Sequence, residues 1–238
     1  MKDQTEQGWR LFDQEIAGYR FIKRKVKCFS TAKARNIIAN MAVKTDASKL
    51  LMIDYDNVFG VAQIERILSH DLDIVGGLYP KKQLSLTPRW VCNFTGETGP
   101  DGLARVKDIG CGFLLSKLSV FERILSNDAL YPSKFEGDLI LAPMFLSEDE
   151  GTRGEKMFQF YAERICEADW NGNGVWPRLL TEDFYFCWAA QQVGFKVWAD
   201  TVCQIGHVGE IDYLTLTAEL QKIQNGGVKP SSGPQLPV

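Results

Sequence analysis

The sequence predicts a single α/β domain with a mixed, mainly parallel central sheet. Two continuous apolar runs, residues 50–53 and 73–79, are typical of strands that are buried on both faces. A helical pattern over residues 61–68 separates them, and a strand, a helix and a strand at this spacing indicate a βαβ unit with parallel strands. The length of 238 residues suits one large domain rather than several independent units.

The segment before the first apolar run is expected to hold two helices and one strand. Apolar residues spaced three and four apart predict a helix over residues 3–17. Residues 19–29 contain the apolar residues Phe21, Ile22, Val26 and Phe29 and are predicted to form a strand. A second helix is expected over residues 32–43, with Ser30 or Thr31 as its N-cap.

The rest of the chain is expected to alternate short strands with helices. Strands are predicted at residues 90–94, 104–109, 113–115, 195–198 and 202–205, and helices at 119–125, 183–192 and 213–223. Turn residues between the first three of these strands indicate an antiparallel portion of the sheet. Residues 145–180 are predicted to be irregular, as lids and binding loops often are. The domain is expected to span residues 1–225, and residues 226–238, which have the composition of a linker, to form a disordered tail.

Composition excludes several classes of protein. No apolar run reaches the roughly 18–20 residues that cross a bilayer, so no membrane span is expected. The polar N-terminus lacks the apolar core of a signal peptide, which favours a cytoplasmic location, or the host cytoplasm if the gene belongs to a bacteriophage. The six cysteines include no CxxC pair, which argues against a zinc ribbon. No feature of the sequence indicates an oligomeric state.

The charges are distributed unevenly along a chain whose net charge is −3. No acidic residue lies between Glu15 and Asp46, but eight basic residues do: Arg20, Lys23, Arg24, Lys25, Lys27, Lys33, Arg35 and Lys44. Such a basic zone predicts contact with a polyanion, namely a phosphate, a diphosphate or a nucleic-acid backbone. The alternative is an ordinary solvated surface.

The first candidate site is the sequence Asp54-Tyr55-Asp56, which directly follows an apolar run. Ligands of open α/β sheets gather at the carboxyl ends of strands. Two carboxylates so close together repel each other unless a cation lies between them, and oxygen ligands suit Mg²⁺ or Mn²⁺. The alternative is a turn, because Asn57 follows and both residue types are common in turns.

Two further candidates lie near the C-terminus. Glu182 and Asp183 open a predicted helix, where acidic residues suit the helix dipole, but a carboxylate on a rigid helix end can also act as a general base. His207 follows a predicted strand and has glycines at 206 and 209. Imidazole is a usual partner of carboxylates around Mn²⁺, although a single histidine is more often structural.

Taken in chain order, these motifs resemble those of the GT-A glycosyltransferases. The resemblance runs from Cys28 to Gly209 and includes the glycines that precede a predicted strand at 113. Its separate pieces are residues 34–36, 51–56, 73–79, 110–115, 181–187 and 207–209. Each motif alone is weak, and the order in which they follow one another carries the resemblance.

The resemblance implies a metal-dependent enzyme that moves a sugar from a nucleotide sugar, with a UDP-sugar as the expected donor, to an acceptor hydroxyl. It assigns Mn²⁺ or Mg²⁺ to Asp54, Asp56 and His207. It assigns donor binding to Arg35, Asn36, Asp54 and Tyr55. It assigns catalysis to Asp183, as the base of an inverting reaction, and to the adjacent Glu182. It assigns acceptor binding to Gly112, Trp176 and Lys81.

Two classes of acceptor fit this resemblance. The basic zone and the expected cytoplasmic location fit a hydroxymethylated base in bacteriophage DNA, which the enzyme would have to take out of the duplex. Trp170 and Trp176 would then be available to stack on the base, although either side chain could equally close the core. A saccharide or protein acceptor fits the family equally well.

The N-terminus departs from the family pattern. GT-A domains begin with a buried strand that supports the nucleoside, whereas this chain begins with a polar helix, so the first strand is expected to be absent or rebuilt. That departure motivates one alternative, a non-catalytic relative that binds sugar or nucleic acid. A second alternative is a haloacid-dehalogenase-like phosphatase with Asp54 as its nucleophile, which the apolar run before Asp54 also resembles.

Overall fold

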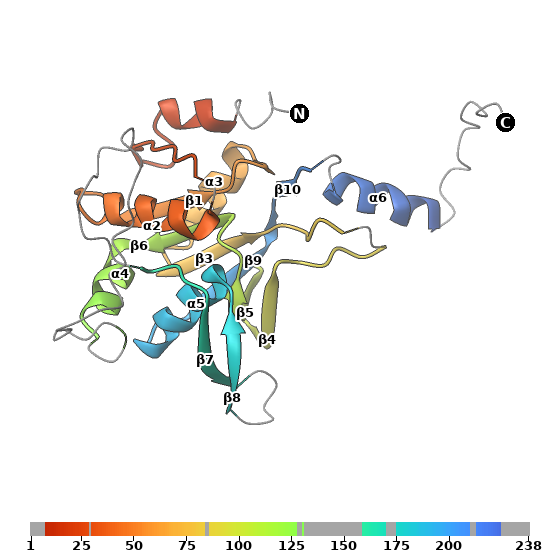
Figure 1. The fold of residues 1–238 in the computed structure, drawn as a ribbon. Coiled ribbons are helices and arrows are strands. Elements are labelled where there is room, and N and C mark those ends of the chain that lie inside the picture. The colour runs from red at the N-terminus through yellow and green to blue at the C-terminus, as the bar shows by residue number, and fades with distance from the viewer. Residues whose placement is uncertain are drawn as a thin grey trace.

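The computed structural model describes residues 8–28, 30–83, 86–127, 130, 159–169, 175–209 and 213–224. Within them, a six-stranded sheet has helices on both faces, which makes the fold a layered α/β domain (Figure 1). The predicted tail, residues 226–238, and residues 145–158 of the predicted irregular segment lie outside the described residues.

The sheet is mixed, as the sequence predicts, but it is not mainly parallel, because four of its five neighbouring strand pairs are antiparallel. Its strands, in spatial order, are β1 (Lys49–Ile53), β6 (Phe113–Lys117), β3 (Ile74–Leu78), β9 (Val197–Gln204), β5 (Leu103–Ile109) and β4 (Cys92–Thr98). β1, β3, β9 and β4 run in one direction, but β6 and β5 run in the other. Only β3 and β9 are therefore parallel neighbours among the described strands, because β6 lies between the two strands of the predicted βαβ unit.

The predicted helices are confirmed within a residue or two at each end, except at the N-terminus. They are α2 (Thr31–Ala42), α3 (Val61–Ser69), α4 (Leu118–Leu125), α5 (Glu182–Gln192) and α6 (Tyr213–Gln224). Ser30 is the N-cap of α2, and its hydroxyl accepts a hydrogen bond from the Lys33 N–H. Residues 3–7 of the helix predicted over 3–17 lie outside the described residues. From residue 8 the chain is helical to the end of a short 3₁₀ helix, η1 (Leu11–Asp13), so the predicted helix extends four residues too far at its C-terminal end.

The core is divided between the two faces of the sheet. Side chains alternate along β6: Leu114 packs in the cluster with α4 and α5, whereas Phe113 and Leu115 pack in the cluster with α3 and the N-terminal segment. Gly76 and Gly77 form the middle of β3, where an added Cβ would lie 2.7 Å from Ile109 and 2.9 Å from Phe113, respectively. The central strand therefore has no room for larger side chains there.

The strand predicted over residues 19–29 is wrong. The described part, residues 19–28, forms no strand, and its one ladder contact is an isolated bridge between Tyr19 and Ile16. A strand needs a neighbour for its backbone hydrogen bonds, and β1, the edge strand nearest in sequence, pairs with β6 alone. This edge position also corrects the expectation that β1 is buried on both faces, because only Met52 of the strand is fully buried. Among the described residues, no strand pairs with the outer side of β1.

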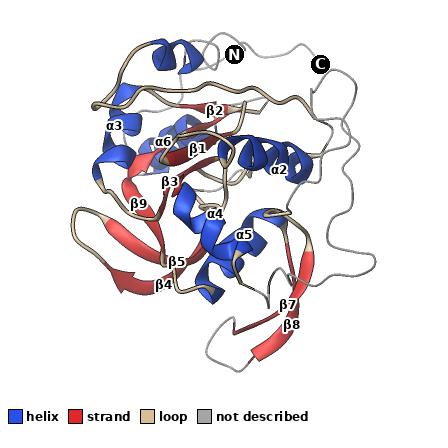
Figure 2. Ribbon diagram, turned by 90° about the vertical axis from the view of Figure 1, so that its left-hand side faces the viewer, coloured by secondary structure: helices blue, strands red, loops and turns tan. Residues whose placement is uncertain are grey.

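Two other segments differ from the prediction. The strands predicted at 195–198 and 202–205 form one strand, β9. The segment predicted to be irregular contains a separate antiparallel pair, β7 (Arg164–Asp169) and β8 (Val175–Leu180), which lies beside α5 (Figure 2). Local pattern gave no sign of these strands because they pair with each other outside the main sheet.

A buried ion cluster joins β9 to α3. Asp200 has no exposed surface, and its carboxylate lies 2.6 Å from Arg66 Nε and 2.7 Å from His70 Nε2. The N–H groups of Val202 and Cys203 donate to its other oxygen. Burial alone would raise the pKa of Asp200, but the hydrogen bonds from Arg66 and His70 hold it below its ordinary value.

Asp200→Asn is expected to destabilise the protein at neutral pH by about 3 kcal/mol, because Arg66 would remain partly buried without its counter-charge. Since the pKa of Asp200 is lowered in the folded state, its contribution is present above the ordinary pKa of 3.8 and is lost as the pH falls below it. Urea unfolding of both proteins at pH 7 and pH 3 measures the difference. Glu97→Gln, which removes an exposed carboxylate, is the control, and an equal effect of both changes at pH 7 would contradict the prediction.

Candidate functional site

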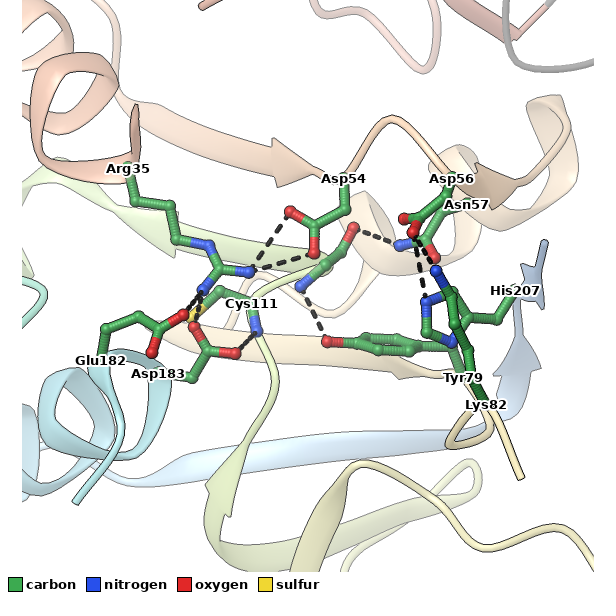
Figure 3. A network of polar contacts seen from close by, with 11 residues as sticks. Arg35, Asp54, Asp56, Asn57, Tyr79, Lys82, Cys111, Glu182, Asp183 and His207 are labelled. Carbon is green, nitrogen blue, oxygen red and sulfur yellow. Dashed lines mark hydrogen bonds and ion pairs between the residues drawn. The ribbon is translucent and has the colours of Figure 1, made fainter. Parts of the chain in front are cut away.

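The motif residues meet at one edge of the sheet, the edge that the carboxyl ends of β1 and β3 form. Asp54 follows β1, Tyr79 follows β3, and Gly112 precedes the antiparallel β6, so all three lie at the same edge (Figure 3). The Asp54 N–H donates to the Gly112 carbonyl over 2.8 Å, which ties the two loops together. α5 begins beside them, with its N-terminal carboxylates turned toward the same edge (Figure 3).

Arg35 joins three carboxylates from distant parts of the chain. Its guanidinium lies 3.0 Å from Asp54 and 3.1 Å from Glu182, and it also donates to Asp183 (Figure 3). The residue is only 5% exposed. Burial alone would lower the pKa of Arg35, but the nearby negative groups, Asp183 first, raise it above its ordinary value. We call Arg35, Asp54, Glu182 and Asp183 the Arg35 cluster.

Asp183 is a buried carboxylate that accepts hydrogen bonds on both of its oxygens. One carboxylate oxygen accepts from Arg35, and the other accepts from the Cys111 N–H over 3.2 Å. Burial raises the pKa of Asp183 to about 6, although Arg35 opposes this effect. A carboxylate with a pKa near neutrality is both largely ionised at pH 7 and basic enough to take a proton in a transition state.

A second cluster surrounds Asp56. Lys82 Nζ lies 2.5 Å from Asp56 Oδ2, and His207 Nε2 lies 3.7 Å from the same oxygen (Figure 3). Burial alone would raise the pKa of Asp56, but the contacts with His207 and Lys82 lower it to about 2. His207 Nδ1 lies 2.7 Å from the Pro80 carbonyl. We call Asp56, Lys82 and His207 the Asp56 cluster.

The backbone at Gly112 joins the two clusters. The Gly112 N–H donates to the Tyr79 hydroxyl over 3.0 Å, and Asn57 Nδ2 donates to the Gly112 carbonyl over 2.5 Å. A Cβ at position 112 would lie 2.8 Å from both the Asn57 amide and the Tyr79 ring, so glycine is required for this close approach. Gly112, predicted to bind the acceptor, thus has a clear part in shaping the site.

The predicted metal ligands do not fit a divalent cation as they lie. Asp54 points to Arg35, whereas Asp56 points to Lys82 and His207, so the two carboxylates do not converge on one point (Figure 3). Among the residues that the structure describes, no three side chains of His, Cys, Asp or Glu come together as metal ligands. Asp56 and His207 are the two predicted ligands that lie near each other.

The predicted donor-binding residues behave differently from one another. Arg35 lies between the carboxylates, and Tyr55 is 77% exposed beside them, where its ring is accessible to a ligand. Asn36 is buried instead, and its amide forms hydrogen bonds in both directions with the backbone of Tyr161. Its side chain therefore anchors the segment before β7, and its polar atoms do not face a nucleotide.

Two predicted acceptor residues remain predictions. Lys81 is exposed at the end of β3, and its N–H donates to the Arg89 carbonyl. Trp176 belongs to β8, but its side chain lies outside the described residues, as does Trp170 entirely.

Sequence reasoning missed Lys82, Tyr79 and the backbone N–H of Cys111. The signal for the first two was available, because they stand at the carboxyl end of the central strand, where ligands of α/β sheets bind. Nothing in the local sequence indicates that the Cys111 N–H donates to Asp183, since the two are 72 residues apart.

Other features of the described chain lie away from this edge. An open hollow of about 390 Å³ is lined by residues at the C-terminal ends of α4 and α5, at the opposite end of α5 from Asp183: Arg123, Ser126, Asn127, Gln192, Val193 and Gly194. None of the helices in the described residues is long and apolar enough to cross a membrane.

The fold and the site define a mixed α/β protein with a carboxylate-rich edge. No protein-family model matches the chain, and no curated protein matches it. Among solved structures, the crystal structure of A197 from STIV is similar over 79% of this chain and 71% of that chain, with 17% sequence identity and a TM-score of 0.41. A likeness at this level assigns no function.

Proposed function

We propose that this protein is a glycosyltransferase that moves a sugar from a nucleotide sugar, with a UDP-sugar as the first candidate, to an acceptor hydroxyl. The observation that carries the proposal is the position of Asp183, a buried carboxylate at the N-terminus of α5 that Arg35 and the Cys111 N–H hold in place. Burial raises its pKa to about 6, which suits a base. Arg35 connects it directly to Asp54, the first residue of the predicted donor motif. A base and a donor site must lie this close for transfer between two bound substrates.

The excess of carboxylates in the Arg35 cluster suits a polyhydroxylated substrate. Ionised carboxylates only accept hydrogen bonds, whereas sugar hydroxyls donate them readily. Arg35 already occupies one oxygen of Asp183, and Glu182 is the least buried of the carboxylates at the start of α5. Glu182 and Asp54 are therefore available to hold sugar hydroxyls while Asp183 faces the acceptor.

In the proposed reaction, Asp183 takes the proton of the acceptor hydroxyl. The acceptor oxygen forms a bond with the anomeric carbon, the bond from that carbon to the diphosphate breaks, and the electron pair leaves with the nucleoside diphosphate. The Cys111 N–H and Arg35 hold the Asp183 carboxylate in a fixed orientation, which keeps the base aligned with the acceptor.

For the acceptor, the exposed basic residues of the N-terminal segment favour a nucleic acid over a saccharide. Residues 20–28 cross the surface without regular structure, and their basic side chains are exposed: Arg20, Lys23, Arg24, Lys25 and Lys27. A hydroxymethylated base in bacteriophage DNA presents both a hydroxyl and a phosphate backbone. The cytoplasmic location expected from the sequence belongs to this proposal.

A ligand panel tests the proposed function. Thermal shift with UDP-, GDP- and dTDP-sugars, each with Mn²⁺ and with EDTA, should show stabilisation by one nucleotide class, because a ligand of the folded state raises its stability. Incubation of that donor with hydroxymethylated DNA or with an oligosaccharide should then give a product whose mass has increased by one sugar. Absence of any stabilisation across the panel, or an aspartyl-phosphate formed at Asp54, would contradict the proposal.

A further inference from the structure

Each carboxylate of the Asp54-Tyr55-Asp56 motif has a cation of the protein itself as its partner. Asp54 is paired with the Arg35 guanidinium at 3.0 Å, and Asp56 with the Lys82 ammonium at 2.5 Å. The mutual repulsion that would call for a divalent cation is thus already relieved by side chains. This differs from the metal site that the sequence motif predicts.

We infer that the Lys82 ammonium takes the place of the divalent cation and holds the diphosphate of the donor, so that nucleotide binding is independent of metal. The inference rests on the proposed function for its ligand, a nucleoside diphosphate. It assigns Lys82 as a binding residue that neither the motif nor the resemblance indicates.

The position of Lys82 suits this role. Its side chain is 39% exposed while its ammonium contacts the partly buried Asp56, so the head group is held by the protein and still accessible to a ligand. An ammonium has three N–H donors, of which Asp56 takes one, and the others remain for phosphate oxygens. Lys82 also follows the carboxyl end of the central strand β3, at the edge where ligands of such sheets bind.

The charge of the surrounding loop supports an anionic ligand. Between Pro80 and Val91 the chain contains Lys81, Lys82 and Arg89 and no acidic residue. Lys81 and Arg89 are exposed, and a backbone hydrogen bond between them holds the loop closed. Asp56 neutralises part of the charge of Lys82, and it also keeps the ammonium in a fixed position, as binding to a diphosphate requires.

The position of His207 next to Asp56 indicates that Lys82 also keeps a metal ion out of the Asp56 cluster. A carbonyl only accepts hydrogen bonds, so the contact with the Pro80 carbonyl places a proton on His207 Nδ1. His207 Nε2 faces Asp56 at 3.7 Å, and a metal ion can bind this nitrogen in place of a proton. Once Lys82 is removed, Asp56 and His207 would form the beginning of a metal site, which Lys82 blocks in the native protein.

The first arm of the experiment uses Mn²⁺ alone and needs no nucleotide. Electron paramagnetic resonance measures the free Mn²⁺ signal during titration of the native protein, Lys82→Met and a control, Lys196→Met. Lys196 is an exposed lysine just before the opposite end of β9. The expected result is at least tenfold tighter Mn²⁺ binding by Lys82→Met than by the other two proteins, and loss of this gain in Lys82→Met combined with His207→Ala.

The second arm uses UDP, GDP and inorganic pyrophosphate in calorimetry with EDTA present. The native protein and Lys196→Met should bind a diphosphate equally well with EDTA and with Mn²⁺, and Lys82→Met should bind it at least tenfold more weakly in EDTA, with Lys82→Arg partly restoring the affinity. Methionine keeps most of the apolar stem of lysine, and the melting temperature of each variant checks that it is folded.

The possible results distinguish the inference about Lys82 from the proposed glycosyltransferase function. Tight Mn²⁺ binding by the native protein, or a tenfold gain in diphosphate affinity on addition of Mn²⁺, would overturn the inference while leaving the proposed function intact. Unchanged diphosphate affinity in a folded Lys82→Met variant would also overturn it. If no protein binds any diphosphate, the role of Lys82 as a phosphate ligand fails together with the proposed function, whereas the first arm still decides whether Lys82 excludes metal.

Discussion

Asp183→Asn is expected to lower the rate of sugar transfer by about 10²–10⁴-fold, the usual contribution of a general base. The asparagine oxygen can still accept from the Cys111 N–H, although its NH₂ group can no longer accept from Arg35. Asp54 and Glu182 remain as partners of that guanidinium, so the fold of the site should persist. The affinity for the donor should also remain, because Asp183 is assigned to the acceptor hydroxyl rather than to the nucleotide. Calorimetry with the donor and a steady-state assay of transfer separate these two effects.

The pH dependence adds a second readout to the same prediction. A base works in its ionised form, and burial raises the pKa of Asp183 to about 6, so the rate should be constant above that pH and fall about tenfold per pH unit below it. Glu182→Gln is the matched comparison, since Glu182 lies next to Asp183 and contacts the same guanidinium. A larger loss of rate in Glu182→Gln would move the base to Glu182, and full activity of Asp183→Asn would exclude Asp183.

Arg35→Met should lower the free energy of unfolding by about 3–5 kcal/mol, because it leaves buried carboxylates without their counter-charge. The loss should be largest at neutral pH. Protonation of Asp183, whose pKa is already raised to about 6, would relieve part of the repulsion as the pH falls. Urea unfolding at pH 7.5 and pH 5 measures both effects.

The control for this prediction is Arg24→Met, which removes an exposed arginine whose guanidinium contacts the neighbouring backbone carbonyl. Exposed changes of this kind are usually within about 0.5 kcal/mol. If Arg35→Met and Arg24→Met have the same free energy of unfolding, the Arg35 cluster does not hold the site together. Transfer activity should be lost in Arg35→Met even under conditions where the variant is fully folded.

The elements that were predicted well are those in which local pattern and tertiary environment agree. Each of the helices α2, α3 and α5 has at least one local signal, namely an apolar face, a capping residue or a terminal glycine. A helix also forms its backbone hydrogen bonds within its own segment and needs no partner strand. The segment over residues 19–29 shows the opposite case. Its apolar residues suit a strand, but a strand forms only where a second strand accepts its hydrogen bonds, and that neighbour is not visible in the local sequence.

For the site, chain order predicted which residues would come together, but not how their charges are paired. Asp54, Asp183 and His207 do lie at one edge, because each stands at the end of a strand or the start of a helix that reaches that edge. The partners of the carboxylates come from elsewhere: Arg35 from the first turns of α2, and Lys82 from the loop after β3. Only the packing of these elements brings opposite charges within contact distance.

The sequence alone therefore determined the α/β class, most helices and the fact that the polar residues gather at the carboxyl ends of strands. These features depend on periodicity, caps and strand ends, which act over a few residues. The tertiary structure alone decided the order and direction of the strands, the edge position of β1 and the cation that each aspartate meets. The physical reason is that strand pairing and ion pairing join residues far apart in the chain, and their energy depends on burial and on distances that no local pattern contains.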